Sequence, residues 1–169
     1  PGHPDRMKRT YLLACLDDRT RMLMHGEFFW AEDLYALELC IEKAFLHYGL
    51  PCRLYVDQGM IFKANVFTRA CAELQVRHIL ATPAHPEGKG KIERFLRSVE
   101  DDFLIELRHA PVNSLQQLNA QFNAWVEEVY HVRQHSELGE SPLQCWQRLL
   151  SVETVRRVEP ERLVRIFLW

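Results

Sequence analysis

Two acidic residues of this chain stand in settings that suit metal-dependent chemistry. Asp57 closes the apolar run Leu54-Tyr55-Val56, and Glu93 lies in a basic segment with helical periodicity, with thirty-five residues between them. Divalent cations such as Mg²⁺ prefer carboxylate oxygens, and a pair of such ions can activate a nucleophile and stabilise a leaving oxygen. A strand end and a helix can bring two carboxylates to one place. This arrangement suggests a divalent-metal site for phosphodiester chemistry.

A simpler interpretation assigns neither acidic residue a function. In it, Asp57 caps a turn, and Glu93 forms a charge ladder of i,i+4 pairs with Lys89 and Arg97, each pair contributing roughly 0.2–0.5 kcal/mol. Carboxylates at the protein surface are the usual case. The neighbouring sequence has to decide between the two interpretations.

Glycines before Glu93 favour the functional interpretation. Gly88 and Gly90 stand where a helix is expected, and a glycine inside a helix costs up to about 1 kcal/mol relative to alanine. Their presence indicates that the segment bends or that a DNA backbone approaches it closely. On a helical projection, Glu93 falls at the edge of the apolar stripe, where a side chain can reach a cleft without being fully buried.

Bulk composition describes an ordinary globular protein. The 169 residues suit one sizeable domain, and 47% of them are hydrophobic and 26% charged. We find no apolar stretch of about 18 residues and no signal-peptide pattern, so we expect a cytoplasmic protein. The five cysteines are widely spaced and predict reduced thiols, without a zinc site or disulfides. The formal net charge of −2 means that any nucleic-acid contact must come from local patches.

Periodicity and capping residues predict the order of elements. Apolar, β-prone runs predict strands at 10–16, 22–30, 53–56 and 76–81. Helical periodicity predicts helices at 31–48, 65–74, from about 87 or 88 to 109, from 115 past 129, and 142–150. Asn65, Ser114 and Ser141 are the expected N-caps, and Pro142 suits the first position of the last helix.

This order predicts an α/β fold in which a mixed sheet is flanked by helices, as in ribonuclease-H-like proteins. The opening Pro1-Gly2-His3-Pro4-Asp5 has turn chemistry, which predicts that a first strand lies before it and is lacking here. We expect a core domain at residues 1–150. The weaker pattern at 151–169 predicts a C-terminal extension or a linker to a further domain.

Several motifs occur together in this chain. They are LDDRTR at 16–21, LYVDQG at 54–59, HPEGKGKIERF at 85–95, YH at 130–131, HSELG at 135–139 and SP at 141–142, with the spacing of thirty-five between Asp57 and Glu93. In combination they resemble the integrase catalytic core of DDE transposases, and most of all bacterial insertion-sequence transposases of the retroviral-integrase type. The resemblance runs from about residue 11 to 146.

The resemblance implies a ribonuclease-H-like polynucleotidyl transferase that uses two Mg²⁺ or Mn²⁺ ions to cleave and join DNA strands in transposition or integration. Asp57 and Glu93 would be the second and third acidic residues of the triad, both metal ligands and both catalytic. No residue here matches the first, which is expected upstream of Pro1, so the fragment alone is expected to be inactive or nearly so. Gln58 departs from the more common asparagine.

The resemblance also implies partners and contacts. The partners would be transposon-end and target DNA and further copies of the chain, because two DNA ends must be joined together, and no membrane is expected. Lys89, Lys91, Arg94 and Arg97 could steady phosphates near the scissile bond, although solvent exposure alone also explains these cations.

Two alternative functions stay open. A ribonuclease-H-like nuclease would cleave strands without joining them, and a non-catalytic DNA-binding remnant would explain the missing first carboxylate. His131 and His135 have the i,i+4 spacing of a metal pair, but no HExxH core accompanies them. We expect these two histidines to serve packing and hydrogen bonding.

Overall fold

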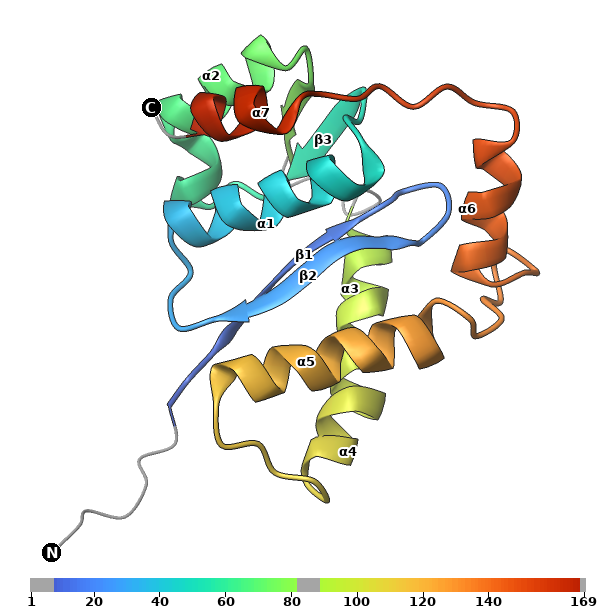
Figure 1. Ribbon diagram of the computed structural model, residues 1–169. Coiled ribbons are helices and arrows are strands. Elements are labelled where there is room, and N and C mark those ends of the chain that lie inside the picture. Colours follow the sequence, from blue (N-terminus) through green and yellow to red (C-terminus); the bar gives the residue numbers. More distant parts are fainter. Residues whose placement is uncertain (1–7, 82–88, 168–169) are drawn as a thin grey trace, which may run out of the picture.

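An antiparallel hairpin of β1 (Tyr11–Leu16) and β2 (Leu23–Phe29) lies at the centre of the computed structural model, which describes residues 8–81 and 89–167 (Figure 1). Tyr11 pairs with Phe29 at the open end. At the closed end, the carboxylate of Asp17 accepts hydrogen bonds from the Thr20 backbone and hydroxyl, both at 2.8 Å. This turn joins the two strands as the sequence predicts.

Both faces of the hairpin are covered, because successive side chains of a strand point to opposite sides. Leu13 and Cys15 pack into one core with α1 (Leu34–Tyr48), whereas Leu12 and Ala14 pack into a second core with the helices below and behind. Figure 1 shows α1 above the hairpin and α5 (Leu115–Trp125) below it. The hairpin therefore separates two apolar cores.

A parallel pair of strands follows α1, with β3 (Arg53–Val56) beside β4 (Arg77–Leu80). The connection contains the 3₁₀ turn η1 (Met60–Lys63) and α2 (Asn65–Glu73). In the described ranges this pair shares no ladder with the hairpin, so these residues form two separate two-stranded sheets, one antiparallel and one parallel, where the sequence predicted one mixed sheet. The expected α/β architecture is confirmed.

The starts of the first two helices differ from the sequence predictions. The first helix begins at Leu34 and not at Ala31, because the Asp33 side chain caps it by accepting from the Ala36 N–H at 2.9 Å. Asn65 does not cap α2: it is the first helical residue, and Ala64 precedes it without a side-chain cap. Both differences lie in the first turn, where several polar residues compete for the cap position.

The two longest helical runs each contain a π-helical turn. One consists of α3 (Gly90–Ser98), η3 (Val99–Phe103) and α4 (Leu104–Leu107), and in the other α5 continues into η4 (Val126–Tyr130). Their inward faces form an aromatic cluster beneath the hairpin. Its rings are those of Phe28, Phe95, Phe103, Phe122, Trp125 and Tyr130.

The predicted caps of the later helices are confirmed. The Ser114 hydroxyl accepts from the Gln117 N–H at 3.1 Å. Ser141 forms a reciprocal capping box with Gln144 at the start of α6 (Pro142–Leu150), with Pro142 in the first helical position. These helices begin where short-range sequence signals place them.

The chain after α6 packs back onto the core, although its weak pattern predicted few packing partners. Arg156 forms a bridge with Leu50, and its guanidinium donates to the Pro51 carbonyl at 2.6 Å. The last helix, α7 (Pro160–Phe167), lies across α1 beside α2, and Leu163 is fully buried (Figure 1). The domain boundary at residue 150 stays a prediction.

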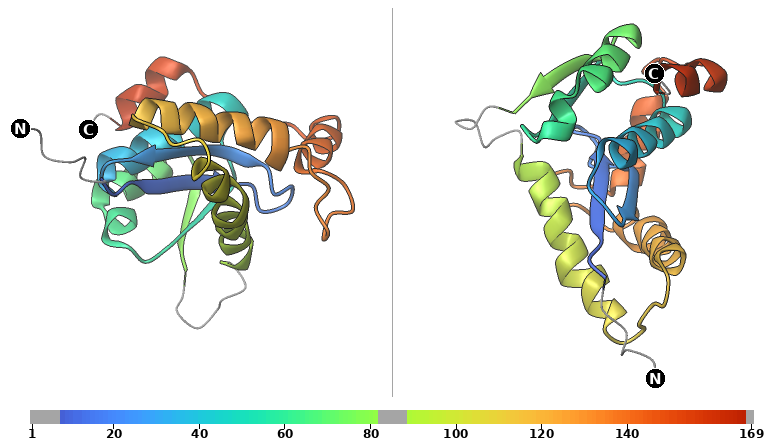
Figure 2. Two further views of the ribbon diagram at one scale, coloured as in Figure 1. Left: turned by 90° about the horizontal axis from the view of Figure 1, so that it is seen from below. Right: turned by 90° about the vertical axis from the view of Figure 1, so that its left-hand side faces the viewer.

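Figure 2 shows α2 and α7 at one end of the molecule and α4 at the other.

All five cysteines are free, and Cys52 is exposed. Within the described ranges, the helices are too short or too polar to cross a membrane. The predicted turn at Pro1–Asp5 and the glycine at position 88 fall outside those ranges.

Gly49 ends α1 in a conformation that side chains other than glycine rarely adopt, with φ of 91° and ψ of 179°. A Cβ atom there would lie 2.3 Å from Val155 Cγ1 and 2.6 Å from the Arg156 carbonyl oxygen. We expect Gly49→Ala to destabilise the fold by at least about 1–3 kcal/mol, the range for such backbone strain alone. Denaturant unfolding followed by circular dichroism measures this loss.

Gly90→Ala is the matched control, because nothing lies within 4 Å of a Cβ built there. Alanine favours the helix by up to about 1 kcal/mol, so its stability should be unchanged or raised. Equal stability of the two variants would show that the 155–156 segment does not pack on the end of α1.

Candidate active site

Asp57 lies directly after β3, at the edge of the parallel pair where both strands end. The preceding Val56 is buried, whereas Asp57 is exposed. The Ala81 N–H donates to the Val56 carbonyl at 2.8 Å, and the Gln58 amide donates to the Ala81 carbonyl at 2.7 Å. Carboxyl ends of parallel strands are common sites of function. Gln58 thus holds the loop that presents the Asp57 carboxylate to solvent.

Lys89 connects Asp57 to the start of α3. Its ammonium lies 2.8 Å from Asp57 Oδ1, which also accepts from the Gln58 N–H at 2.6 Å. The hydrogen bond from Lys89 lowers the pKa of Asp57 below its ordinary value, and the Gln58 N–H adds to this effect. The same bond raises the pKa of Lys89, with further contributions from the charges of Asp57, Glu93 and Tyr55. Both acidic residues therefore raise the pKa of Lys89.

Glu93 is in the first turn of α3 and its side chain is exposed. The i,i+4 ladder of Lys89, Glu93 and Arg97 is not among the ion pairs of the described residues. Because α3 begins at Gly90, Lys89 precedes the helix and its side chain reaches Asp57 instead. The structure thus places a cation beside Asp57 and within the electrostatic influence of Glu93.

The carboxylate oxygens of Asp57 and Glu93 are of the type that a hard divalent cation prefers, but two carboxylates are too few to complete the site. The Asp57 carboxylate contacts the Lys89 ammonium, and the charge of Glu93 also acts on that ammonium, so this position favours positive charge. Within 8–81 and 89–167 there is no cluster of three or more acidic, histidine or cysteine side chains able to hold a metal. Asp57 and Glu93 are the residues that would hold such an ion.

The other predicted DNA-contacting cations are mostly paired with carboxylates from distant segments. Lys91 lies 2.7 Å from Asp18 of the hairpin turn, and Arg94 lies 2.5 Å from Glu137. Arg97 is exposed, and none of the recorded ion pairs of the described ranges includes it. These carboxylates would therefore compete with a phosphate for Lys91 and Arg94.

Sequence reasoning missed a cluster that joins the hairpin turn to α3. Arg21 has a φ of 61°, its guanidinium lies 3.3 Å from Glu137, and its carbonyl accepts from the Tyr130 hydroxyl at 2.9 Å. Ser136 accepts from Arg94 at 2.8 Å. Burial raises the pKa of Tyr130 to about 12. The motifs at 16–21 and 135–139 contain these residues, but their contact is a long-range one that neither motif reveals.

The expected structural role is confirmed for His131. Its imidazole is buried and accepts the Leu23 N–H at Nε2, at 3.2 Å. Desolvation lowers the pKa of His131 to about 4, so the ring is neutral at pH 7. His135 Nδ1 accepts from the Glu137 N–H at 3.3 Å. Both histidines hold backbone N–H groups.

Comparison with known proteins identifies relatives of this arrangement. The family profile of the TnsB C-terminal domain matches residues 29–108, a range that includes Asp57, Glu93, Lys89 and the three cations of α3. The transposase for transposon Tn552 from Staphylococcus aureus is 24% identical over 106 residues, covering 58% of this chain and 22% of that protein. The transposase for insertion sequence IS1202 from Streptococcus pneumoniae is 22% identical over 131 residues, covering 70% of this chain and 28% of that protein.

Solved structures show the same fold. The catalytic core domain of BIV integrase superposes with a TM-score of 0.69 at 18% identity, covering 84% of this chain and 88% of that one. The HTLV-2 integrase catalytic core domain in complex with magnesium gives 0.66 at 15% identity, covering 80% and 84%. The chain is similar in sequence to transposases and in fold to integrase catalytic cores. The expected resemblance to transposase/integrase cores and the ribonuclease-H-like fold are thereby confirmed.

The core spans less than a third of the length of the transposases it matches. Its similarity to the integrase domains, in contrast, extends over most of both chains. The likeness to the integrases establishes the fold, and the sequence relatives establish a role of the group in transposition or integration.

Burial of neutral His131 makes the stability of this core depend on pH. Its folded pKa of about 4 lies below the ordinary 6.5, so its contribution is full above pH 6.5 and is lost as the pH falls toward 4. We expect this group to remove about 2 kcal/mol of unfolding free energy between pH 7 and pH 5. Urea unfolding at several pH values measures the loss.

His131→Gln should be less stable at pH 7 but should lack this part of the pH dependence. The exposed His109→Gln is the control and should keep the wild-type profile. Parallel profiles for His131→Gln and the wild type would contradict the assignment.

Proposed function

We propose that this core cleaves and transfers DNA strands in transposition or integration by two-metal-ion phosphodiester chemistry. One observation supports the proposal above the others. Asp57, at the end of a parallel strand, pairs with Lys89, and the charge of Glu93 acts on the same lysine. The alternative interpretation as a simple helical charge ladder lacks its expected ion pairs. Transposase relatives at the sequence level support the same reaction class.

In the proposed reaction Asp57 and Glu93 hold Mg²⁺ or Mn²⁺. The bound ions would supply activation of water or a DNA 3′-hydroxyl and stabilisation of the leaving oxygen. Gln58 orients the loop that carries Asp57, and Lys89 must leave Asp57 when the ion enters. Once released, Lys89 is free to contact a phosphate near the scissile bond, which positions DNA without reading its bases.

The proposal includes a third carboxylate and further partners. The first acidic residue of the triad, which the resemblance implies, would complete the metal site with Asp57 and Glu93. Lys91, Arg94 and Arg97 are the proposed further phosphate contacts. The full reaction joins two transposon ends to a target duplex, so we propose that the chain acts as a homo-oligomer on DNA.

One alternative also has an observation in its favour. The described ranges hold no metal-binding cluster of three side chains, and Lys89 compensates Asp57, as would suit a non-catalytic DNA-binding remnant. An aspartate on an apolar strand directly upstream of Pro1 in the gene product would exclude the remnant. Strand-transfer products from paired terminal-repeat DNA and a target duplex would separate the transposase from a nuclease, which yields cleavage alone.

Removal of either carboxylate tests the catalytic assignment. We expect Asp57→Asn and Glu93→Gln in the full-length gene product to abolish Mg²⁺-dependent strand transfer, because each variant loses a metal-binding oxygen charge. Gel analysis of strand-transfer products measures activity, and circular dichroism checks that the fold is kept. Glu128→Gln, an exposed acid on η4, is the control with unchanged activity. Wild-type strand transfer in either carboxylate variant would refute the assignment.

Replacement of Lys89 tests whether its ammonium competes with a metal ion. In the chain as given, Lys89→Met should tighten Mn²⁺ binding roughly two- to fivefold, because an exposed ion pair of modest strength no longer competes. Isothermal titration calorimetry measures the dissociation constant. Lys63→Met is the control, since Lys63 contacts only the neutral Gln58 amide, at 3.5 Å. An unchanged Mn²⁺ affinity in Lys89→Met, or an equal gain in both variants, would count against a shared cation position.

A further inference from the structure

A small hollow of about 90 Å³ lies beside the first turns of α3, on the side of the hairpin turn. Its lining combines the apolar surface of Phe95 with cations and hydrogen-bonding groups. They include Arg21, Lys91, Arg94, Tyr130, His135 and Glu137. Gly90 also lines the hollow, and nothing lies within 4 Å of the position that a Cβ would take there. Gly90 thus leaves open space at the first turn of α3, the turn that also carries Glu93.

Glu137 places one carboxylate oxygen against each of two arginines. Its Oε1 lies 2.5 Å from Arg94 Nη1, and its Oε2 lies 3.3 Å from Arg21 Nη2. The side chain of Glu137 is 54% exposed, whereas that of Arg21 is 11% exposed. A mostly buried guanidinium thus faces a carboxylate that is largely in water. Because the Glu137 carboxylate lies largely in water, it can exchange for another anion without being drawn out of a buried position.

Arg21 is held in place by contacts other than the one to Glu137. Its guanidinium donates to the carbonyls of Asp18 and Arg19, and its own carbonyl accepts from the Tyr130 hydroxyl. A buried guanidinium without an anionic partner is costly. If Glu137 moves away, Arg21 stays where it is and requires another anion.

The loop that carries Glu137 can remain in place while its side chain moves. The His135 N–H donates to the Glu140 carbonyl at 3.0 Å, and the Gly139 N–H donates to the His135 carbonyl at 2.9 Å. These backbone bonds close the loop without using the carboxylate. Exchange at the hollow therefore needs a rotation of one side chain and no rearrangement of the fold.

We propose that the hollow is a binding site for a phosphodiester of the DNA backbone, and that Glu137 is its exchangeable occupant in the free protein. Two neighbouring guanidiniums bind carboxylate and phosphate oxygens through the same forked geometry. With Glu137 rotated out, Arg21 and Arg94 face a single phosphate, and Arg94 directly follows Glu93 in α3. The choice of DNA as the source of the phosphate rests on the proposed function.

The experiment compares DNA affinity before and after the occupant is neutralised. Glu137→Gln keeps the size of the side chain and removes its charge. Fluorescence anisotropy with a short labelled duplex, in EDTA and at low salt, should show a gain in affinity of roughly two- to fivefold, because the carboxylate no longer competes for the guanidiniums. EDTA removes divalent metal, so the result does not depend on the two-metal chemistry.

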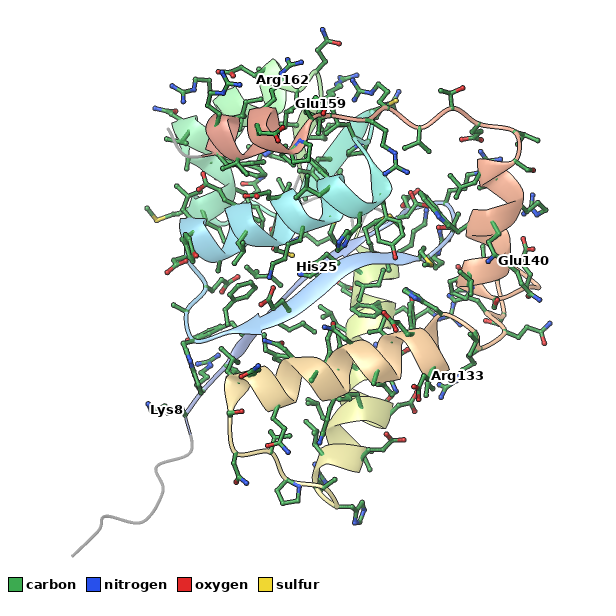
Figure 3. All side chains as sticks on the ribbon, in the orientation of Figure 1. Lys8, His25, Arg133, Glu140, Glu159 and Arg162 are labelled. Carbon is green, nitrogen blue, oxygen red and sulfur yellow. The ribbon has the colours of Figure 1, made fainter. Side chains whose placement is uncertain are left out.

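Glu140→Gln is the matched control. Glu140 precedes α6 (Figure 3) and pairs with Arg148 at 2.5 Å, so its loss removes the same charge from the same loop without opening the hollow. Arg94→Gln supplies a second comparison, because the gain from Glu137→Gln should disappear in the double variant Arg94→Gln/Glu137→Gln. A purely long-range charge effect would persist in that double variant.

Titration with inorganic phosphate separates the site from its proposed source. ¹⁵N signals of the Arg21 and Arg94 side chains should shift with both phosphate and duplex, and further in Glu137→Gln than in Glu140→Gln. Equal DNA affinities of Glu137→Gln and Glu140→Gln would overturn the proposal. A response to phosphate but not to the duplex would overturn the assignment to DNA. Loss of strand transfer in Asp57→Asn bears on the chemistry alone and leaves this test unaffected.

Discussion

Burial of the β1–β2 hairpin on both faces is the constraint on which the rest of the structure depends. Adjacent residues such as Leu12 and Leu13 enter different cores, so a slip of one residue in the register would exchange the two sets of side chains. The apolar core beneath the hairpin holds α3 in place through Phe95, which is 2% exposed and contacts the Tyr130 ring. Once Phe95 faces inward, Glu93 is left at the surface.

Local signals account for much of what could be predicted from the sequence. The strand Arg53–Val56 has the bounds expected of a short apolar run, and Ser114 and Ser141 cap helices because their partners lie only three residues away. Asp33 was overlooked as a cap because the helical periodicity extends back to Ala31. Position and exposure of Asp57 also follow from local pattern, since it closes a strand before a turn.

Long-range charge pairing could not be predicted in this way. Partners such as Lys91 and Asp18 are separated by dozens of residues, and many other acids along the chain would satisfy the same lysine equally well. The Lys89–Glu93 pair of the charge-ladder interpretation does not form, for a specific reason. A shift of the helix start from 87 or 88 to Gly90 placed Lys89 outside the helix, and this turned an expected i,i+4 partner of Glu93 into a partner of Asp57. The chain's slight negative charge agrees with cations that are mostly compensated internally.

The π-helical turns η3 and η4 each contain one residue more than the corresponding α-helical turn, as the Leu104 and His131 N–H groups bond to carbonyls five residues earlier. Both lie downstream of the turn that carries Glu93, and both border the aromatic cluster. Loss of a single codon in either segment could convert it to an ordinary α-turn while the preceding helix keeps its orientation. A change of one residue in the length of η3 or η4 would therefore alter the helices beneath the hairpin and leave Asp57 and Glu93 in place.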